Sequence, residues 1–425
     1  AAGELLRETA GPREKAVHPF WTGLARVTTT FPWNLLIVLA VVAATGAVGA
    51  AVLRVRISDD FMMSLPRGTP TYEAFQRLIA TFGMGAMNPY RVVLEPAAGG
   101  PGSVVTPEFW GASQRILQEM ATRLPNTQAA DFQFMSYAAG LPVPWDLAQA
   151  CLAHREPAPL QGSCRQLRYA VDKFSNPQRS VAFAVVMLKF DPVGTAGPEW
   201  LREARSLLDE LSQSTGVRLS LIGIGADSLD MIAKTYQVFP YMIAVTLAMA
   251  LLLLGAAFRS VLIPLRCVGS IVLTLLWVYG LAVLAYQDGI LNWVGLEGVR
   301  NTYKAQNYLL PVICFSMVVG ICLDYDIFLL SRTTEYRSQG LPAVEAIREG
   351  LCSTGGVITA AGVIMAIAFG GLAFASMFIV NGLSFYMVFA VLYDTFVARC
   401  LFTPAAMSLL GRRNWAPSAL GGRGW

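Results

Sequence analysis

Long apolar stretches constrain this chain more than any other feature of its sequence. A helix needs about 20 mainly apolar residues to cross the hydrocarbon core of a membrane. One such stretch lies at 34–53, and nearly everything after Val238 belongs to others. The pattern predicts six transmembrane helices, at 34–53, 238–258, 261–286, 308–330, 357–378 and 383–410, the last one kinked near Thr403-Pro404. With 55% hydrophobic and 14% charged residues, the chain is too apolar for an ordinary soluble protein.

The region between the first two spans, residues 54–235, has the pattern of a water-soluble α/β domain. Strand-like runs alternate with segments of helical spacing, which predicts a small sheet backed on one side by helices. The predicted strands lie at 91–95, 180–190 and 217–223, and the predicted helices at 106–124 and 198–215. We therefore expect a polytopic α-helical membrane protein with an α/β domain inserted after the first of its six transmembrane helices.

The seven cysteines fall into two groups. Five lie in or beside the apolar spans, where a cysteine usually serves as a small buried hydrophobic residue. Cys151 and Cys164 lie in the α/β region, within a proline-containing stretch at 140–177 that we expect to be an irregular insertion. If this region faces an oxidising compartment, the two residues can form a disulfide bond.

Basic residues that flank the spans predict the orientation of the chain, because cytoplasmic loops are enriched in Arg and Lys. The relevant residues are Arg259, Arg266, Arg332, Arg337, Arg348, Arg412 and Arg413. We expect both termini in the cytoplasm and the α/β domain on the extracellular, periplasmic or luminal side. Segment 1–33 predicts an amphipathic helix at the membrane surface, 333–352 a helix along the cytoplasmic surface, and 412–425 a cytoplasmic tail. Because the first residue is Ala, we expect processing or truncation of a longer protein.

The heptapeptide Gly320-Ile-Cys-Leu-Asp-Tyr-Asp326 is the strongest candidate for a functional site. Each carboxylate inside a span costs about 2.5–3.5 kcal/mol on insertion scales, so two of them need compensation. Helical spacing places Asp324 and Asp326 on nearly opposite sides, with Gly320 on the Asp324 side, where a neighbouring helix can approach closely. Asp324 can carry a proton with Tyr325 as a relay hydroxyl, or it can join two spans by hydrogen bonds. Asp326 can handle protons or pair with Arg332 or Arg399.

Neighbouring spans contain polar residues that can support this motif. Thr359 can donate a hydrogen bond to a carboxyl across a close contact at Gly356 and Ala360, although bonding to its own helix is the commoner arrangement. Asp394 is a third acid within a span. It can pair with Arg399, five residues further on, or with a neighbouring helix.

The sequence offers no support for an enzyme, a cofactor or a metal site. His18 and His154 are the two histidines, and neither lies in a predicted span, so no metal-ligand cluster or histidine-based triad is indicated. The glycine-rich pieces lack the context and the lysine of a phosphate loop. The net charge of +4 is small and does not indicate a nucleic-acid partner.

Four motifs together resemble the MMPL family of the resistance-nodulation-cell division (RND) superfamily. They are GICLDYDIFLLSR at 320–332, TAAG at 359–362, FAVLYD at 389–394 and GRRNW at 411–415. The resemblance is strong across 238–415, looser over the first span, and only architectural in the α/β domain. One span, a large outer domain and five more spans resemble one half of such a transporter, and the closing Arg-Arg-Asn-Trp resembles the C-terminal half.

The resemblance implies a role for individual residues. Asp324 and Tyr325 match the Asp-Tyr pair that relays protons in energised family members, and Asp394 matches a supporting acidic position on the last span. The outer α/β domain would correspond to the porter domain. The implied function is half of a secondary active transporter that exports lipids or other hydrophobic compounds, with the proton gradient as energy source. Asp326 is an additional acid that the family pattern does not require, which leaves open whether the relay is shifted.

The partner of this chain and its function both stay open at this point. Family members have two halves whose fourth spans face each other, whereas this sequence holds one Asp-Tyr pair. The expected partner is therefore the missing N-terminal half or a second copy, besides membrane lipids and a hydrophobic substrate. The alternative function is a sterol or lipid sensor, since the motif is also similar to that of Patched-like and Dispatched-like proteins. A third possibility is an accessory half that scaffolds a partner chain.

Overall fold

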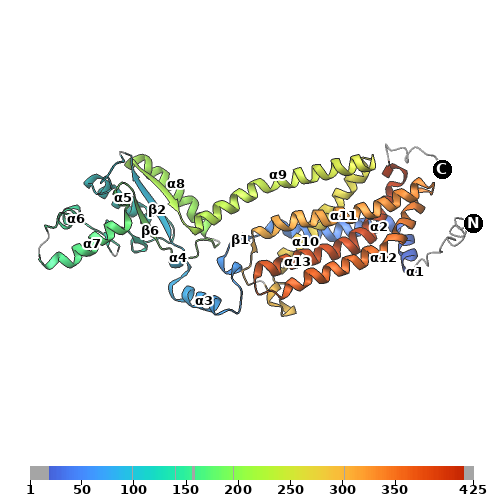
Figure 1. Ribbon diagram of the computed structural model, residues 1–425, viewed down its shortest axis with the longest axis horizontal. Helices are drawn as coiled ribbons and strands as arrows, with labels where there is room; N and C mark the ends of the chain where they lie inside the picture. The colour runs from blue at the N-terminus through green and yellow to red at the C-terminus, as the bar shows by residue number, and fades with distance from the viewer. Residues whose placement is uncertain are drawn as a thin grey trace, which may run out of the picture. The chain divides into compact units, whose positions relative to one another are not determined.

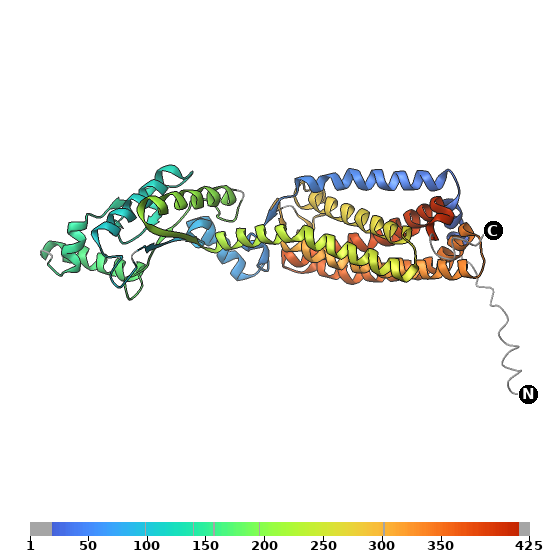
Figure 2. The same ribbon diagram turned by 90° about the horizontal axis from the view of Figure 1, so that it is seen from above.

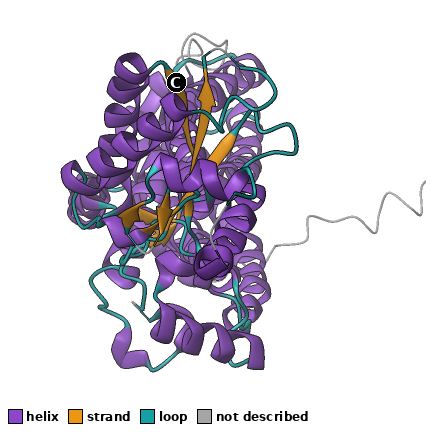
Figure 3. Cartoon of the chain, turned by 90° about the vertical axis from the view of Figure 1, so that its left-hand side faces the viewer, coloured by secondary structure: helices purple, strands orange, loops and turns teal. Residues whose placement is uncertain are grey.

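The structure is a computed structural model that describes residues 19–415, apart from residues 98, 139, 156–157, 195 and 301. Its chain divides into two compact units. The helical unit combines the residues up to Ile57 with those from Val238 onward, and the α/β unit is Ser58–Gln237. Figure 1 labels the elements of both units, and Figure 3 shows that helices dominate the chain while the strands are few.

Six helical segments are long and apolar enough to cross a membrane, which confirms the predicted number. They are Trp33–Arg54, made of α2 (Trp33–Gly49) and η1 (Ala50–Arg54); α9 (Ile224–Phe258); α10 (Leu262–Tyr286); α11 (Leu309–Ser338); Ala343–Phe374, made of α12 (Ala343–Gly370) and η7 (Gly371–Phe374); and Phe378–Leu410. The last segment consists of α13 (Phe378–Leu392), the π-helix η8 (Tyr393–Phe402) and α14 (Thr403–Leu410).

The predicted surface helix at 333–352 is wrong. α11 continues to Ser338, and α12 already begins at Ala343. The short turn between them contains Gly340, whose φ of 100° suits glycine, and Pro342 directly before the first residue of α12. The apolar face expected along the membrane surface is instead packed inside the unit, since Ile347 and Leu351 are buried.

Glycines allow helices of the helical unit to approach closely. A Cβ atom on Gly280 of α10 would lie 2.1 Å from the carbonyl oxygen of Val48 in α2, the blue helix at one edge of Figure 2. On α12, a Cβ atom on Gly355 would lie 2.4 Å from the Trp21 ring of α1 (Pro19–Thr29). The close contact with α1 is therefore at Gly355 rather than at Gly356, where the nearest atom would be 3.7 Å away.

The two ends of the described chain pack against the helical unit. From α12, Arg348 Nε donates to Thr29 Oγ1 of α1 at 2.7 Å. In the first part of the segment predicted as a cytoplasmic tail, 412–425, Asn414 and Trp415 of η9 (Gly411–Trp415) are buried. Its cytoplasmic location stays a prediction. Residues 1–18 of the predicted amphipathic segment, and residues 416–425 of the tail, lie outside the described residues.

The α/β unit contains a four-stranded antiparallel sheet in the order β3-β6-β2-β7. Along the chain, β2 (Tyr90–Pro96), α5 (Pro107–Arg123) and β3 (Phe132–Gln133) precede β6 (Ala182–Val186), α8 (Gly197–Thr215) and β7 (Val217–Ile222). This is the β-α-β-β-α-β arrangement of ferredoxin-like folds. All three predicted strands and both predicted helices of the unit are present, with ends shifted by a few residues.

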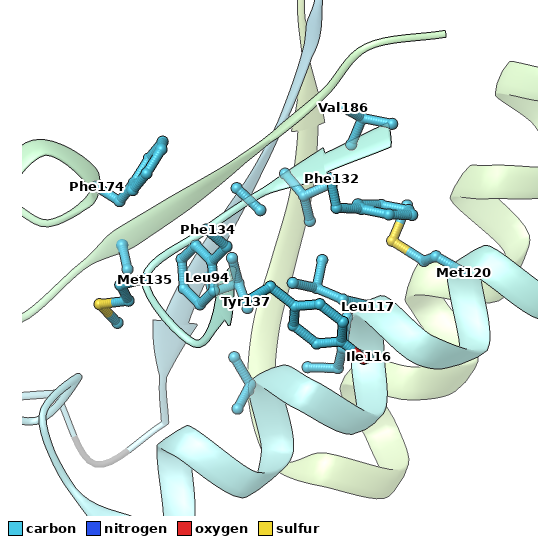
Figure 4. Close-up of a cluster of buried hydrophobic side chains, with 14 of the residues drawn as sticks. Leu94, Ile116, Leu117, Met120, Phe132, Phe134, Met135, Tyr137, Phe174 and Val186 are labelled. Carbon is cyan, nitrogen blue, oxygen red and sulfur yellow. The ribbon is translucent and has the colours of Figure 1, made fainter. Parts of the chain in front are cut away.

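The core of the α/β unit lies between the sheet and its helices. Alternate residues of β2 and β6 are buried, as expected for a sheet covered on one face. Figure 4 shows Leu94 and Phe132 from the strands gathered with Ile116 and Leu117 of α5. At the start of α5, Thr106 Oγ1 accepts a hydrogen bond from Phe109 N at 3.2 Å, which is the predicted cap.

The stretch at 140–177 is not irregular as predicted. It folds into α6 (Trp145–Leu152) and α7 (Gln161–Phe174), which pack against the core through Cys151, Cys164 and Val171 among others. The sulfur atoms of Cys151 and Cys164 are bonded at 1.92 Å, so a disulfide joins the two helices. The sequence pattern gives little helical signal here, because prolines flank α6 and α7 contains few apolar residues.

The remaining described elements are short or connecting. They are β1 (Ile57–Ser58), η2 (Phe61–Ser64), α3 (Pro70–Phe82), α4 (Met84–Met87), η3 (Ala129–Asp131), β4 (Tyr137–Ala138), β5 (Leu141–Pro142), η4 (Ala158–Leu160), η5 (Asn292–Val294), η6 (Glu297–Val299) and β8 (Gln306–Asn307).

Candidate functional site

The two aspartates of the heptapeptide point to opposite sides of α11, as their spacing predicts. Asp326 is fully buried, whereas Asp324 lies on the exposed face of the helix. Asp324 forms no hydrogen bond or ion pair with any residue in the described part of the chain. The close helix contact expected at Gly320 is also absent there, because a Cβ atom on Gly320 would meet nothing within 4 Å. The Asp324 side of α11 thus has no partner within the described part of the chain.

Asp326 belongs to a buried cluster of charged side chains. Arg399 Nη1 lies 2.6 Å from Asp326 Oδ1, and Arg399 Nη2 lies 3.0 Å from Asp394 Oδ2. Arg399 Nε also donates to Asp394 Oδ2 at 3.1 Å, and Nη2 donates to the carbonyl oxygen of Cys322 on α11. All three charged side chains are 0% exposed. One guanidinium therefore joins two carboxylates from α11 and η8.

The π-helix η8 explains why Asp394 and Arg399 meet. In an α-helix, residues four apart lie one above the other, whereas residues five apart diverge. A π-helix closes its turns with i→i+5 hydrogen bonds, seen here from Thr403 N to the carbonyl oxygen of Ala398. This widened turn brings the Arg399 guanidinium onto both oxygens of Asp394. Thr403-Pro404, where we predicted the kink, starts α14 directly after this π-helix.

Tyr325 lies between the exposed face of α11 and the buried cluster. Its hydroxyl donates to Met365 Sδ at 3.0 Å, and its ring centre is 5.9 Å from Cζ of Arg399. A guanidinium at this distance from an aromatic ring is attracted to it. Tyr325 is therefore adjacent in sequence to both aspartates and in contact with the arginine that holds Asp326.

The other polar residues expected near the motif have separate partners. Thr359 Oγ1 donates to the carbonyl oxygen of Gly355 at 2.8 Å, which is the commoner bonding to its own helix rather than a bond to a carboxyl. The thiols of Cys267 and Cys322 lie beside the cluster and interact with Asp326 and Asp394 respectively. Sequence reasoning did not identify these two cysteines as neighbours of the acids.

The exposed face of α11 carries small and polar side chains. Ser316, Gly320, Asp324 and Ser331 recur at helical spacing along it, with apolar Ile313 and Ile327 between them. Small residues favour close approach of a second helix in a membrane. This stripe, defined by the six residues named above, is called the α11 stripe below.

Among the described residues no group of His, Cys, Asp and Glu side chains has the arrangement of a metal site. The cluster and its neighbours supply carboxyl, phenol and thiol groups, which can bind and release protons, and a guanidinium, which forms ion pairs with carboxylates.

Comparison with known proteins identifies the family. Residues 63–425 match the MMPL family. The chain belongs to the MMPL family. This family is part of the RND superfamily of transporters, so the six apolar helices are those of an integral, multi-pass membrane protein.

Three MMPL relatives illustrate the similarity. The chain is 30% identical over 240 residues to membrane protein YdfJ of Bacillus subtilis, across 56% of this chain and 32% of YdfJ. It is 32% identical over 221 residues to the trehalose monomycolate exporter MmpL3 of Mycobacterium tuberculosis, across 50% of this chain and 22% of MmpL3. It is 28% identical over 257 residues to the sulfolipid-1 exporter MmpL8 of the same species, across 59% of this chain and 22% of MmpL8. The alignments thus cover a third or less of these relatives.

Proposed function

We propose that this MMPL chain is half of a proton-driven exporter of lipids or other hydrophobic compounds, with Asp324 and Tyr325 as its proton relay. Two relatives are named as lipid exporters, which supports the substrate class. The family membership supports transport rather than an enzymatic reaction. The relay rests on the position of Asp324 within a span.

The exposure of Asp324 is the observation that carries this proposal. Asp324 lies near the middle of α11, a segment long and apolar enough to cross the membrane. A carboxyl facing lipid at that depth costs about 2.5–3.5 kcal/mol or must be protonated. The side chain therefore needs protein or water beside it, and the described residues of this chain supply no protein partner. A site that is shielded from lipid and alternately reached by water is suited to taking up and releasing a proton.

The partner of the α11 stripe is the missing N-terminal half or a second copy of this chain. Either would bring a further helix against the stripe and shield Asp324 from lipid. The relatives, of which the alignments cover a third or less, contain enough additional chain for a second half.

Tyr325 couples this outer acid to the buried cluster. Its ring contacts Arg399, which in turn holds Asp326 and Asp394. A proton arriving at Asp324 changes the charge beside Tyr325 and so the balance of charges around Arg399. Each proton that crosses the membrane inward supplies about 2.3 kcal/mol per 100 mV of potential, besides the contribution of the pH difference.

The α/β unit serves as the porter domain in this proposal. We place it outside the cytoplasm and both termini inside, because arginines follow the second, fourth and sixth spans. The disulfide between Cys151 and Cys164 supports an oxidising compartment for this unit.

Replacement of Asp324 by Asn tests the relay. In cells that lack the native gene, we expect Asp324→Asn to abolish export of the lipid that accumulates in the deletion strain, measured by comparative lipidomics. The variant should fold and insert normally, because its side chain has no partner within the described chain. Asp288→Asn provides the matched control, since Asp288 forms a partly exposed ion pair with Arg54 beyond the end of α10.

Full export by Asp324→Asn would remove this residue from the mechanism. Lipid binding to reconstituted protein that does not respond to an imposed pH gradient would favour the alternative, a sterol or lipid sensor. A fixed complex with a different, complete transporter chain on purification would favour an accessory half.

A further inference from the structure

The buried cluster contains two carboxylates but only one guanidinium in contact with them. Asp326, Asp394 and Arg399 are all fully shielded, and no other cation lies within ion-pair distance of either acid among the described residues. With every group ionised, the three side chains carry one excess negative charge. An uncompensated buried charge costs several kcal/mol, so the cluster has a physical reason to bind a proton.

Arg399 supports the two carboxylates unequally. Asp394 accepts three hydrogen bonds from it, at 3.1, 3.1 and 3.0 Å. Asp326 Oδ1 is only 2.6 Å from Arg399 Nη1, yet neither oxygen of Asp326 accepts a well-directed hydrogen bond from a residue in the described part of the chain. Hydrogen-bond donors stabilise the anionic form of a carboxyl. Asp326 is therefore the acid of the pair that accepts fewer hydrogen bonds.

One group beside Asp326 can exchange a proton with it. This is the thiol of Cys267 on α10. A thiol can both donate and accept a hydrogen bond, which suits it to a proton path.

The charged and titratable groups that face Asp326 come from three elements. η8 contributes Asp394 and Arg399, and α11 itself contributes Cys322. α10 contributes Cys267 and the buried Arg266, whose Nη2 donates to Cys267 Sγ at 3.7 Å and which forms no ion pair with any described residue. The sequences of α13, α14 and the last 21 residues of α9 contain no charged side chain.

We propose that Asp326 is a second proton-binding site of this chain, separate from Asp324 and enclosed within the helical unit. Protonation of Asp326 removes its ion pair with Arg399 and leaves Arg399 to Asp394. The link between α11 and η8 then weakens, so binding of a proton changes how these two elements are held together. The use of this proton in export rests on the proposed function, whereas proton binding itself can be measured without transport.

Infrared difference spectroscopy of the purified protein in lipid, between neutral and acidic pH, tests the proposal. A protonated carboxyl has a C=O band that carboxylates lack. We expect one such band to persist in Asp324→Asn and to be lost in Asp326→Asn. Asp326→Glu, which keeps a carboxyl at this position, should move the band, whereas Asp394→Glu should leave it in place.

The same spectra define what overturns the proposal. An unchanged set of bands in Asp326→Asn would show that Asp326 stays ionised, and a band that moves in Asp394→Glu would assign the proton to Asp394. If Asp326→Asn does not fold, the shift expected for Asp326→Glu decides the question, since an unmoved band contradicts the assignment. Failure of export in Asp324→Asn is a separate result, because these measurements involve no substrate.

Discussion

Arg399 is the residue that holds the buried cluster together. It contacts Asp326 and Asp394 and also donates to the carbonyl oxygen of Cys322, so one side chain joins η8 to α11. Removal of one partner of a buried ion pair usually costs about 3–5 kcal/mol, because the other charge is left unpaired. Loss of Arg399 would leave two carboxylates unpaired, so the free energy of unfolding should fall by at least about 3 kcal/mol.

We therefore expect Arg399→Gln to lower the free energy of unfolding by at least about 3 kcal/mol. Thermal unfolding in detergent measures this as a reduced Tm. Arg332→Gln is the matched control, because Arg332 pairs with Glu335 at the half-exposed end of α11 and such pairs contribute about 0–1 kcal/mol. Equal Tm values for the two variants would contradict the stabilising role of Arg399.

Asp60 makes the stability of the α/β unit depend on pH. Burial raises the pKa of its carboxyl above the ordinary 3.8, with further contributions from Asp191 and Asp59, while a hydrogen bond from Met62 N acts in the opposite direction. The folded state thus binds this proton more tightly than the unfolded state. The free energy of unfolding should therefore fall as the pH rises from 3.8 through the raised pKa.

Asp60→Asn should remove this dependence and stabilise the unit at neutral pH, since an amide oxygen can still accept from Met62 N. Hydrogen exchange of the η2 region in the whole protein, corrected for the intrinsic effect of pH, measures local protection in both proteins. A greater loss of protection in the variant with rising pH would have the wrong sign for this explanation.

At the scale of helices and strands, close glycine contacts position the spans. α10 approaches α2 so closely at Gly280 that an added methyl group would meet the backbone of Val48. Overpacking of a close contact typically costs about 1–3 kcal/mol. Gly269 lies on the same helix, but a Cβ atom there would meet nothing within 4 Å. The two glycines thus offer a matched comparison on one element.

Gly280→Ala should lower the Tm of the protein, because α2 and α10 must separate to make room. Gly269→Ala should leave the Tm unchanged or raise it slightly, since alanine favours the helix by up to about 1 kcal/mol. Thermal unfolding in detergent compares the two variants. A Tm for Gly280→Ala equal to that for Gly269→Ala would contradict the observed packing.

The sequence predicted elements better than it predicted their ends and contacts. Apolar length identified six spans, because that length depends only on the thickness of the membrane. It missed the extension of α11 to Ser338 because polar residues continue a helix beyond the membrane without an apolar signal. The spacing of Asp324 and Asp326 predicted their opposite directions. The contact of Arg399 with both acids depended on a π-helix, for which the sequence has no comparable signal.

At the scale of the whole molecule, the proposed function places a second half against Asp324 and the α11 stripe. The helical unit shields Asp326 and Asp394 by itself, but it leaves Asp324 without a partner among the described residues. A membrane requires that this carboxyl be neutral, paired or hydrated. In the proposed exporter, the Asp324 carboxyl is neutral, paired and hydrated in turn as it takes up and releases the proton.

Proton flux through the reconstituted protein tests this account most directly. With its lipid substrate present, wild-type protein in liposomes should dissipate an imposed pH gradient, followed by a pH-sensitive dye inside the vesicles. Asp324→Asn, reconstituted to the same density, should leave the gradient as stable as in empty liposomes. Equal proton flux through wild type and Asp324→Asn would contradict the claim that this carboxyl carries the proton.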